Sequence, residues 1–276
     1  MNSQELIDSI KSRALVPISQ STFSPLDLLS FATDIMRTRI VPFVIRFQED
    51  YFVKEELTSV IPERALGAKL KSVSIVGEGR EIPIPRLEPA DLGKNIQGFV
   101  LRGNKIILNA TPPWHQTKVS YYARPGTLVL PEAASQILAV SGNELEVTQV
   151  PPTFQPGISV DLIGLEPTFD LISTPKILEI RGKKLVLGSI FEGIKAGFWV
   201  ARIGESPVPQ IPLELHPLLA QAVAVQLLES LGFADKAASA QQTYDRMEAD
   251  VVTLISPRID ESRKRVINRN PLVRFS

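Results

Sequence analysis

Residues 217–254 read PLLAQAVAVQLLESLGFADKAASAQQTYDRMEADVVTL, with one proline at the start and one glycine near the middle. Proline suits the first turn of a helix, where it needs no N–H, and glycine suits the position just after a helix. The stretch therefore predicts two helices separated by Gly232, the first with its apolar side chains on one stripe. In the second helix, six residues recur at alternating spacings of three and four and form what we call the apolar seam: Ala237, Ala240, Tyr244, Met247, Val251 and Leu254. We expect the two helices to pack as an antiparallel pair on the N-terminal helices.

The N-terminal region is expected to be helical as well. Ser24, Pro25 and Asp27 supply an N-cap hydroxyl, a proline for the first turn and an acid near the helix N-terminus, so a helix should begin there and run to about residue 51. Pro42 should kink or divide this helix, because it has no N–H to donate and its ring crowds the preceding turn. A shorter helix is expected over residues 3–14.

The middle of the chain has the composition of short strands and loops. All but one of the 16 glycines and most of the 22 prolines lie between residues 57 and 212, and both residues interrupt regular elements. Hairpins are predicted at residues 99–108, 137–147 and 177–187, each around a glycine-containing turn. Their turn glycines fall at similar intervals, but the stretches between them look dissimilar, so we expect no blade-like repeat. Together the hairpins predict a small antiparallel sandwich or barrel.

The predicted fold class is α+β, in which N- and C-terminal helices form a helical bundle with an inserted antiparallel β sandwich or barrel domain and an extended basic C-terminal arm. The expected parts are the N-terminal helices at 1–56, the β domain at 57–212, the helix pair at 213–256 and the arm at 257–276. The arm has six basic residues and two acidic ones: Arg258, Asp260, Glu261, Arg263, Lys264, Arg265, Arg269 and Arg274. A segment of this kind has too few apolar residues to fold alone, so we expect it to become ordered on a partner.

Composition excludes several classes of protein. The 30 Lys and Arg residues balance the 30 Asp and Glu residues, which disfavours a histone-like or polybasic membrane protein. With no cysteine, disulfide scaffolds, thiolate nucleophiles and cysteine zinc sites are excluded. The start of the chain lacks a signal-peptide apolar core, and no uninterrupted apolar run is long enough for a membrane span. We expect a soluble protein with no membrane contact.

Groups suited to catalysis are few. The two histidines, His115 and His216, lie beside prolines and in no pattern typical of a metal site or a nucleophile–base pair. Residues 77–79, Gly-Glu-Gly, are expected to be a hairpin turn, since a phosphate-binding loop needs further glycines and a following helix. The acid pairs at 55–56 and 260–261 are read as solvated surface. We therefore predict no catalytic residue, no cofactor and no metal site, and no enzyme activity.

Tyr121, Tyr122 and Trp114 offer a different chemistry, because aromatic rings on an oligonucleotide-binding barrel stack against bases. Alternation along a strand should send one tyrosine inward, which favours a role in filling the core.

Several segments resemble head-to-tail adaptor (connector) proteins of tailed bacteriophages. They are IPRLEPADL at 84–92, GFVLRGNKIIL at 98–108, VSYYARP at 119–125 and VPPTF at 150–154, followed by 227–232 in the closing helices and SPR at 256–258. The resemblance extends over nearly the whole chain. It rests more on the order of the helices, strands and tail than on any single sequence motif.

The resemblance implies a structural protein that forms a ring, usually twelvefold, beneath the portal, so that DNA leaves the capsid through a sealed channel without specific binding. The family typically combines a helical bundle with an inserted β domain and grips the portal with a C-terminal extension. The residues we assign to portal binding are the arm's basic and apolar side chains: Arg258, Arg263, Lys264, Arg265, Arg269, Leu272, Arg274 and Phe275. The apolar seam is assigned to packing within the ring or the bundle. The size of the β segment exceeds that of the minimal helical adaptors.

An alternative from another class is a nucleic-acid-binding module, in which the β barrel stacks bases on Tyr121 or Tyr122 and the basic tail follows the phosphates.

Overall fold

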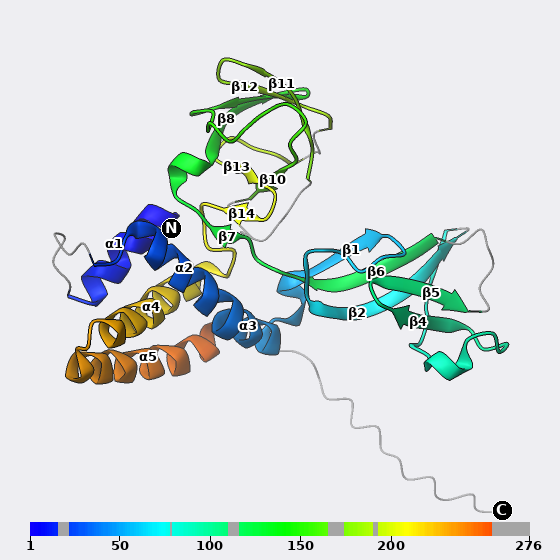
Figure 1. The fold of residues 1–276 in the computed structure, drawn as a ribbon, viewed down its shortest axis with the longest axis horizontal. Helices are drawn as coiled ribbons and strands as arrows, with labels where there is room; N and C mark the ends of the chain where they lie inside the picture. Colours follow the sequence, from blue (N-terminus) through cyan, green and yellow to red (C-terminus); the bar gives the residue numbers. More distant parts are fainter. Residues whose placement is uncertain (16–21, 78, 110–115, 165–173, 190–192, 256–276) are drawn as a thin grey trace, which may run out of the picture.

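The computed structural model describes residues 1–15, 22–77, 79–109, 116–164, 174–189 and 193–255. The protein is mixed α+β, with helices from both ends of the chain at one side and two groups of curled, half-barrel strands extending from them (Figure 1). The α+β class is as the sequence predicts. No helix among the residues described is long and apolar enough to cross a bilayer.

The helices begin and end close to the predicted positions. They are α1 (Ser3–Arg13), α2 (Pro25–Ile35), α3 (Val41–Phe47), α4 (His216–Ser230) and α5 (Ala234–Ile255). Short 3-10 turns lie at η2 (Glu49–Phe52), η3 (Pro89–Asp91), η4 (Pro131–Ala133) and η5 (Leu213–Leu215). Helix α2 starts with the expected reciprocal cap, in which the Asp27 N–H donates to Ser24 Oγ at 3.2 Å and the Ser24 N–H donates to Asp27 Oδ2 at 2.7 Å.

Pro42 divides the second helix, but with little interruption. Between α2 and α3 the chain forms one π-helical segment, η1 (Met36–Ile40), and the Val41 N–H donates to the carbonyl of Met36. A wider turn gives room for the proline ring, which would otherwise crowd the carbonyl of the preceding turn. The π segment thus lets the helix continue past Pro42 to Phe47.

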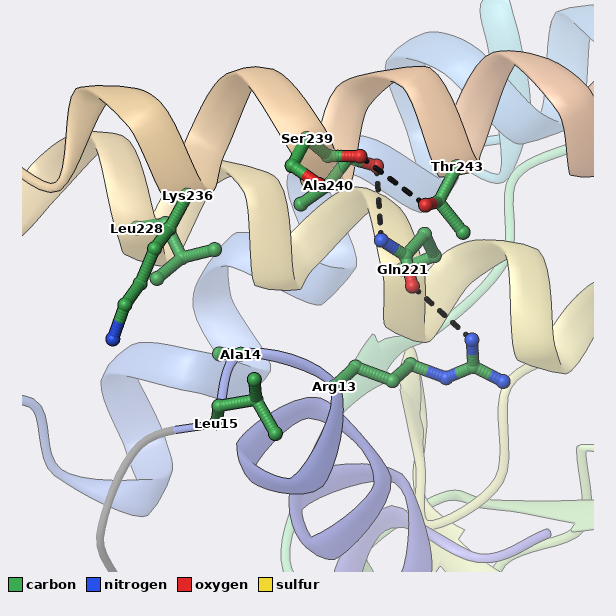
Figure 2. A pocket seen from close by; sticks show the side chains of 9 residues that line it. All are labelled: Arg13, Ala14, Leu15, Gln221, Leu228, Lys236, Ser239, Ala240 and Thr243. Atoms are coloured by element: carbon green, nitrogen blue, oxygen red, sulfur yellow. Dashed lines mark hydrogen bonds between the residues drawn. The ribbon is translucent and has the colours of Figure 1, made fainter.

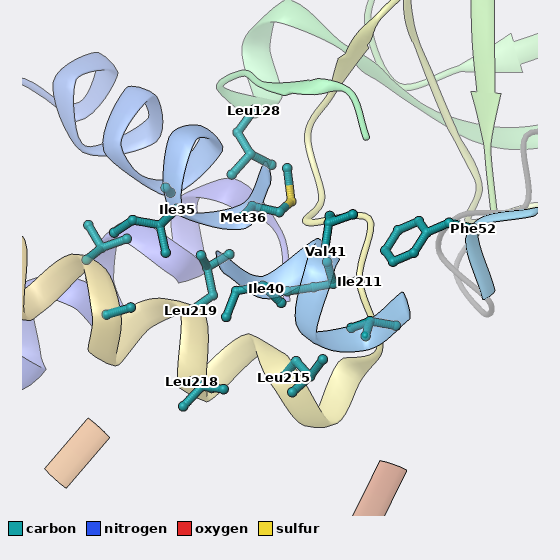
Figure 3. Close-up of a cluster of buried hydrophobic side chains, with 14 of the residues drawn as sticks. Ile35, Met36, Ile40, Val41, Phe52, Leu128, Ile211, Leu215, Leu218 and Leu219 are labelled. Carbon is teal, nitrogen blue, oxygen red and sulfur yellow. The ribbon is translucent and has the colours of Figure 1, made fainter. Parts of the chain in front are cut away.

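Helix α4 is the centre of the helical layer, because it contacts α1, α2 and α5. The predicted single apolar stripe is wrong for this helix: Ala220, Ala224 and Val225, which lie outside that stripe, are buried as well. A helix that is apolar all round is buried on every side. Figure 3 shows side chains of α2, η1 and α4 meeting beside Leu128 and Phe52, so the helices and the start of the β region share one core.

The first β unit contains β1 (Val53–Leu57), β2 (Ala65–Gly77), β3 (Arg80–Pro83) and β6 (Gln116–Ala123) in the order β1-β6-β2-β3. A hairpin of β4 (Gly98–Arg102) and β5 (Lys105–Asn109) folds against it through two isolated bridges, Val60 with Lys105 and Arg86 with Phe99. The inward side chains of this unit belong to the same hydrophobic cluster as the helices.

The second β unit has six strands in the order β10-β13-β8-β9-β12-β11. Their bounds are β8 (Ser135–Ser141), β9 (Glu144–Val147), β10 (Val160–Ile163), β11 (Ile177–Arg181), β12 (Lys184–Leu187) and β13 (Trp199–Arg202). A parallel pair, β7 (Thr127–Leu128) with β14 (Glu205–Ser206), lies at its base. The unit has its own hydrophobic cluster, separate from that of the helices. The segment expected as one β domain therefore contains two units, because Pro and Gly content does not distinguish one sheet from two.

The second unit is built from two copies of a three-stranded module. In the first hairpin Ile137 pairs with Val147 and a bulge follows Ile137; in the second, Ile177 pairs with Leu187 and a bulge follows Ile177. Each position in the first hairpin thus has its equivalent 40 residues later. The same offset relates β10 to β13, which pair antiparallel with each other.

The pairing between the modules is two-fold symmetric. Trp199 pairs with Gln136, and the equivalent residues one module away, Ser159 and Lys176, form an isolated bridge. That bridge joins the residues just before β10 and β11, the two edge strands, so the curl of the sheet brings the starts of its edges together. The expectation of no repeat is wrong for the hairpins at 137–147 and 177–187, and holds for the hairpin at 99–108, which belongs to the first unit.

An ion pair connects the two β units. Arg64 Nη1 lies 2.6 Å from Asp161 Oδ2, and the side chain of Asp161 is 1% exposed. Asp161 also accepts from the Gly204 N–H at 2.8 Å and from Thr174 Oγ1 at 3.4 Å. Burial raises the pKa of Asp161, and the nearby Arg64 charge opposes that rise. The contact holds the second unit against the loop that precedes β2.

Candidate interaction site

The apolar seam lies on α5 and faces the other helices over most of its length. Ala237, Tyr244 and Val251 are buried, and Ala240 and Met247 pack against the same cluster. Leu254 does not pack in the helical layer, because it is 66% exposed and the next residue, Ile255, is buried; its assignment to packing within a ring stays a prediction. An α-helix has 3.6 residues per turn, so a strict alternation of three and four drifts off the buried face along the helix.

The residues assigned to portal binding, from Arg258 to Phe275, lie outside the described residues, as do Trp114, His115 and the acid pair at 260–261. Their assignments stay predictions from the sequence.

His216 is buried at the start of α4, with its Nε2 3.3 Å from the carbonyl oxygen of Ile211. Burial lowers its pKa to about 4, so the ring is neutral at physiological pH. Among the described residues no group of three or more His, Asp and Glu side chains could hold a metal ion. His216 therefore acts as a core residue at a helix start.

The other candidate motifs of the sequence are structural in this fold. Gly77 pairs with Arg80 at the turn between β2 and β3, as expected of a hairpin. Glu55 lies on β1 with its carboxylate 2.7 Å from Lys118 Nζ, and Glu56 accepts a hydrogen bond from the hydroxyl of Tyr121. The two carboxylates thus serve separate partners and form no acid–base pair.

Both tyrosines of β6 are buried, which contradicts base stacking by either ring. Tyr121 is 2% exposed and Tyr122 is 5% exposed. The hydroxyl of Tyr121 donates to Glu56, and the hydroxyl of Tyr122 donates to Glu49. Burial raises the pKa of both phenols. The expectation that one of them points outward is also wrong: both belong to the core that the first β unit shares with the helices.

A pocket of about 240 Å³ lies where the end of α1 meets α4 and α5 (Figure 2). Its walls combine aliphatic side chains with two cations and two hydroxyls: Arg13, Ala14, Leu15, Gln221, Leu228, Lys236, Ser239, Ala240 and Thr243. Figure 2 shows Arg13 and Lys236 at opposite ends of the pocket. None of these lining residues is acidic, so the pocket is positively charged.

Arg13 is held in place by neutral groups. Its Nη1 donates to Gln221 Oε1 at 3.1 Å and its Nε donates to Ser9 Oγ at 3.3 Å. Gln221 is fixed in turn, because its Nε2 donates to the carbonyl of Ala240 at 3.0 Å. Within the described part of the chain, no carboxylate lies within ion-pair distance of Arg13. Burial lowers the pKa of this guanidinium, which reflects a charge that is partly desolvated without a counterion.

A second pocket, of about 420 Å³, lies between β2, β3 and β4. Its lining includes the apolar Leu70, Val73 and Phe99 together with Arg86. Lys71, which also lines it, is already paired with Asp50 at 2.5 Å. We regard the first pocket as the stronger candidate site, because its half-buried cation, Arg13, has no acidic partner among the residues described.

Sequence reasoning did not find the first pocket, since its residues are spread over three helices. Arg13 gives no local signal, because a basic residue in the last turn of a helix is common. The chain matches no known protein family and no curated protein.

Proposed function

We propose that this chain is a noncatalytic structural protein of a tailed-phage virion, a head-to-tail adaptor. Copies of it form a ring, a dodecamer in this proposal, that joins the portal to the tail or to a tail-completion protein and continues the channel through which DNA passes without specific binding. The ring lies at the head-tail junction and is assembled in the host cytoplasm.

One observation carries the proposal. Helices from the two ends of the chain pack in one layer around α4, and the β units are inserted between them. In this proposal the helical layer corresponds to the helical bundle of the adaptor family, and the two β units correspond to the β domain inserted into it. The basic stretch at 257–276 follows α5, which ends at Ile255, and in this proposal it binds the portal.

The alternative of a nucleic-acid-binding module is less well supported, because both tyrosine rings of β6 are buried. Binding to phosphates alone would weaken steeply with salt. We therefore expect little affinity for a free oligonucleotide at moderate salt.

The proposal is tested by removing the arm. A chain ending at Ser256 should fold with unchanged stability, because α5 ends before that residue, but should lose binding to the portal of the same phage. Two full-length variants separate the contributions of the arm. One replaces the basic side chains by Ser and keeps Leu272 and Phe275; the other replaces only those two by Ser. Unchanged portal affinity of the truncated chain would refute the assignment of the arm.

A further inference from the structure

The positively charged pocket between α1, α4 and α5 has a negatively charged counterpart elsewhere on α5. Lys236 and Asp245 are nine residues apart on α5, which is about two and a half turns, so their side chains lie on opposite flanks of the helix. Asp245 is exposed, and the half-buried Glu248 lies on the same side of the helix. We call Asp245 and Glu248 the acidic flank.

The acidic flank is unpaired within the part of the chain that is described. Asp245 Oδ1 accepts only from the neutral Gln241 Nε2, at 2.6 Å, and Glu248 Oε1 accepts from the hydroxyl of Tyr244 at 3.2 Å. No lysine or arginine of the described residues lies within ion-pair distance of either carboxylate. The pocket thus has two cations, Arg13 of α1 and Lys236 of α5, and no acid among its lining residues, while the acidic flank of α5 has no cationic partner among the described residues.

We propose that the pocket containing Arg13 and Lys236 on one copy of this chain receives the acidic flank of the next copy. Two different surfaces of one chain that bind each other make a head-to-tail contact, and such contacts close into a ring when the rotation between copies allows it. The occupant is a second copy because its carboxylates match the unpaired cations, and because the two surfaces lie on opposite sides of one helix. This inference rests on the proposed ring-forming function.

The chemistry of the contact follows from the pocket. Its aliphatic walls, Ala14 and Leu228, surround the stem of an entering Asp or Glu side chain, and the cation at either end, Arg13 or Lys236, binds a carboxylate of the acidic flank. Arginine can donate two parallel hydrogen bonds to a carboxylate, a strong and geometrically specific contact. The Ser239 hydroxyl lines the same pocket and can donate to a carboxylate oxygen, whereas the Thr243 hydroxyl already donates to the carbonyl of Ser239 at 3.2 Å.

Charge reversal tests the contact without disturbing the core, since Lys236 and Asp245 are both exposed. Lys236→Glu and Asp245→Lys should each raise, by at least about tenfold, the protein concentration at which rings form on the portal, because each brings like charges together. An equimolar mixture of the two variants should restore rings. When the two variants alternate around the ring, the introduced glutamate of one meets the introduced lysine of the other at one interface, and the native Lys236 and Asp245 meet at the next.

The matched control is Arg246→Glu, which reverses a cation on the solvent-facing side of the same helix and should leave ring formation unchanged. Native mass spectrometry and electron microscopy of each sample with the portal give the readout. Rings from either single variant at the wild-type concentration, or no rescue in the mixture, would overturn this inference alone. A wild-type chain that never forms rings on the portal would overturn the proposed function, and this inference with it.

Discussion

We expect Asp161→Ala to destabilise the fold by about 3–5 kcal/mol, which is the usual cost of removing one partner of a buried ion pair. Asp161 is 1% exposed and Arg64 is 18% exposed. The substitution leaves the Arg64 guanidinium and the Gly204 N–H without the carboxylate that each contacts, at 2.6 and 2.8 Å. The loss should come from the unpaired donors rather than from strand packing, because the equivalent position in the other module is Ala201, which is buried in the same sheet.

A paired substitution separates charge from packing. Replacing a buried ion pair on both sides by apolar residues is often nearly neutral, so Arg64→Met combined with Asp161→Ala should lose markedly less stability than Asp161→Ala alone. Burial raises the pKa of Asp161, which is consistent with a pair whose desolvation offsets much of its attraction.

The assay is urea unfolding. The chain has two tryptophans, so in a Trp114→Phe background the fluorescence of Trp199 on β13 reports the second β unit, and circular dichroism reports the whole chain. A loss of about 3 kcal/mol with a slope of about 2–3 kcal/mol per M lowers the urea midpoint by about 1 M or more. An Asp161→Ala midpoint within about 0.3 M of the wild type, or a double variant as unstable as the sum of the single variants, would refute the reasoning.

Three further expectations concern single residues. Burial lowers the pKa of His216 from 6.5 to about 4, so the fold should lose up to about 3 kcal/mol of stability as the pH falls from about 6.5 to about 4, and His216→Gln should abolish that loss in urea titrations at about pH 7 and about pH 4.5. Leu15 is exposed with φ 50°, so Leu15→Gly should stabilise the fold by about 1 kcal/mol and raise the melting temperature; a lower melting temperature would contradict this. A Cβ on Gly98 would lie 2.7 Å from the Pro85 carbonyl oxygen, so Gly98→Ala should cost about 1–3 kcal/mol, while Gly188→Ala, with nothing closer than 3.8 Å, should cost little; equal losses in thermal melts would rule out the clash.

Local sequence signals predicted the helix boundaries and the hairpins well. The reciprocal cap at Ser24 and Asp27 marks the start of α2, and the turn glycines Gly103, Gly142 and Gly182 all have positive φ. These features depend on residues within one or two turns of each other, so a single sequence contains them in full.

Long-range features were missed because their signals are spread along the chain. The module repeat is maintained by the inward Ile, Leu and Val positions, such as Ile137 and Ile177 or Leu145 and Leu185, and residues of these types occur in any strand. The loops between them differ, which hid the common register. At the equivalent positions of the two modules the residues are Asp161 and Ala201, and only Asp161 pairs with Arg64. The two sequences therefore differ in residue type at this position.

The candidate site shows the same limit. Arg13, Gln221 and Thr243 come together only because α1, α4 and α5 pack as they do, and no spacing in the sequence joins them. The apolar seam was predicted from its spacing and lies on the buried face of α5 as far as Val251. In the next turn the buried residue is Ile255 and not the predicted Leu254. Ile255 lies about five full turns of an α-helix beyond Ala237, whereas Leu254 falls short of the buried face.

Under the proposed function, electron microscopy of the purified full-length chain mixed with the portal protein that the proposal assigns to it tests the central claim most directly. We expect end views of the complex to show rotationally symmetric rings of this chain stacked on the portal ring, around an open channel. Portal rings that stay bare at concentrations where both proteins are folded would contradict the account.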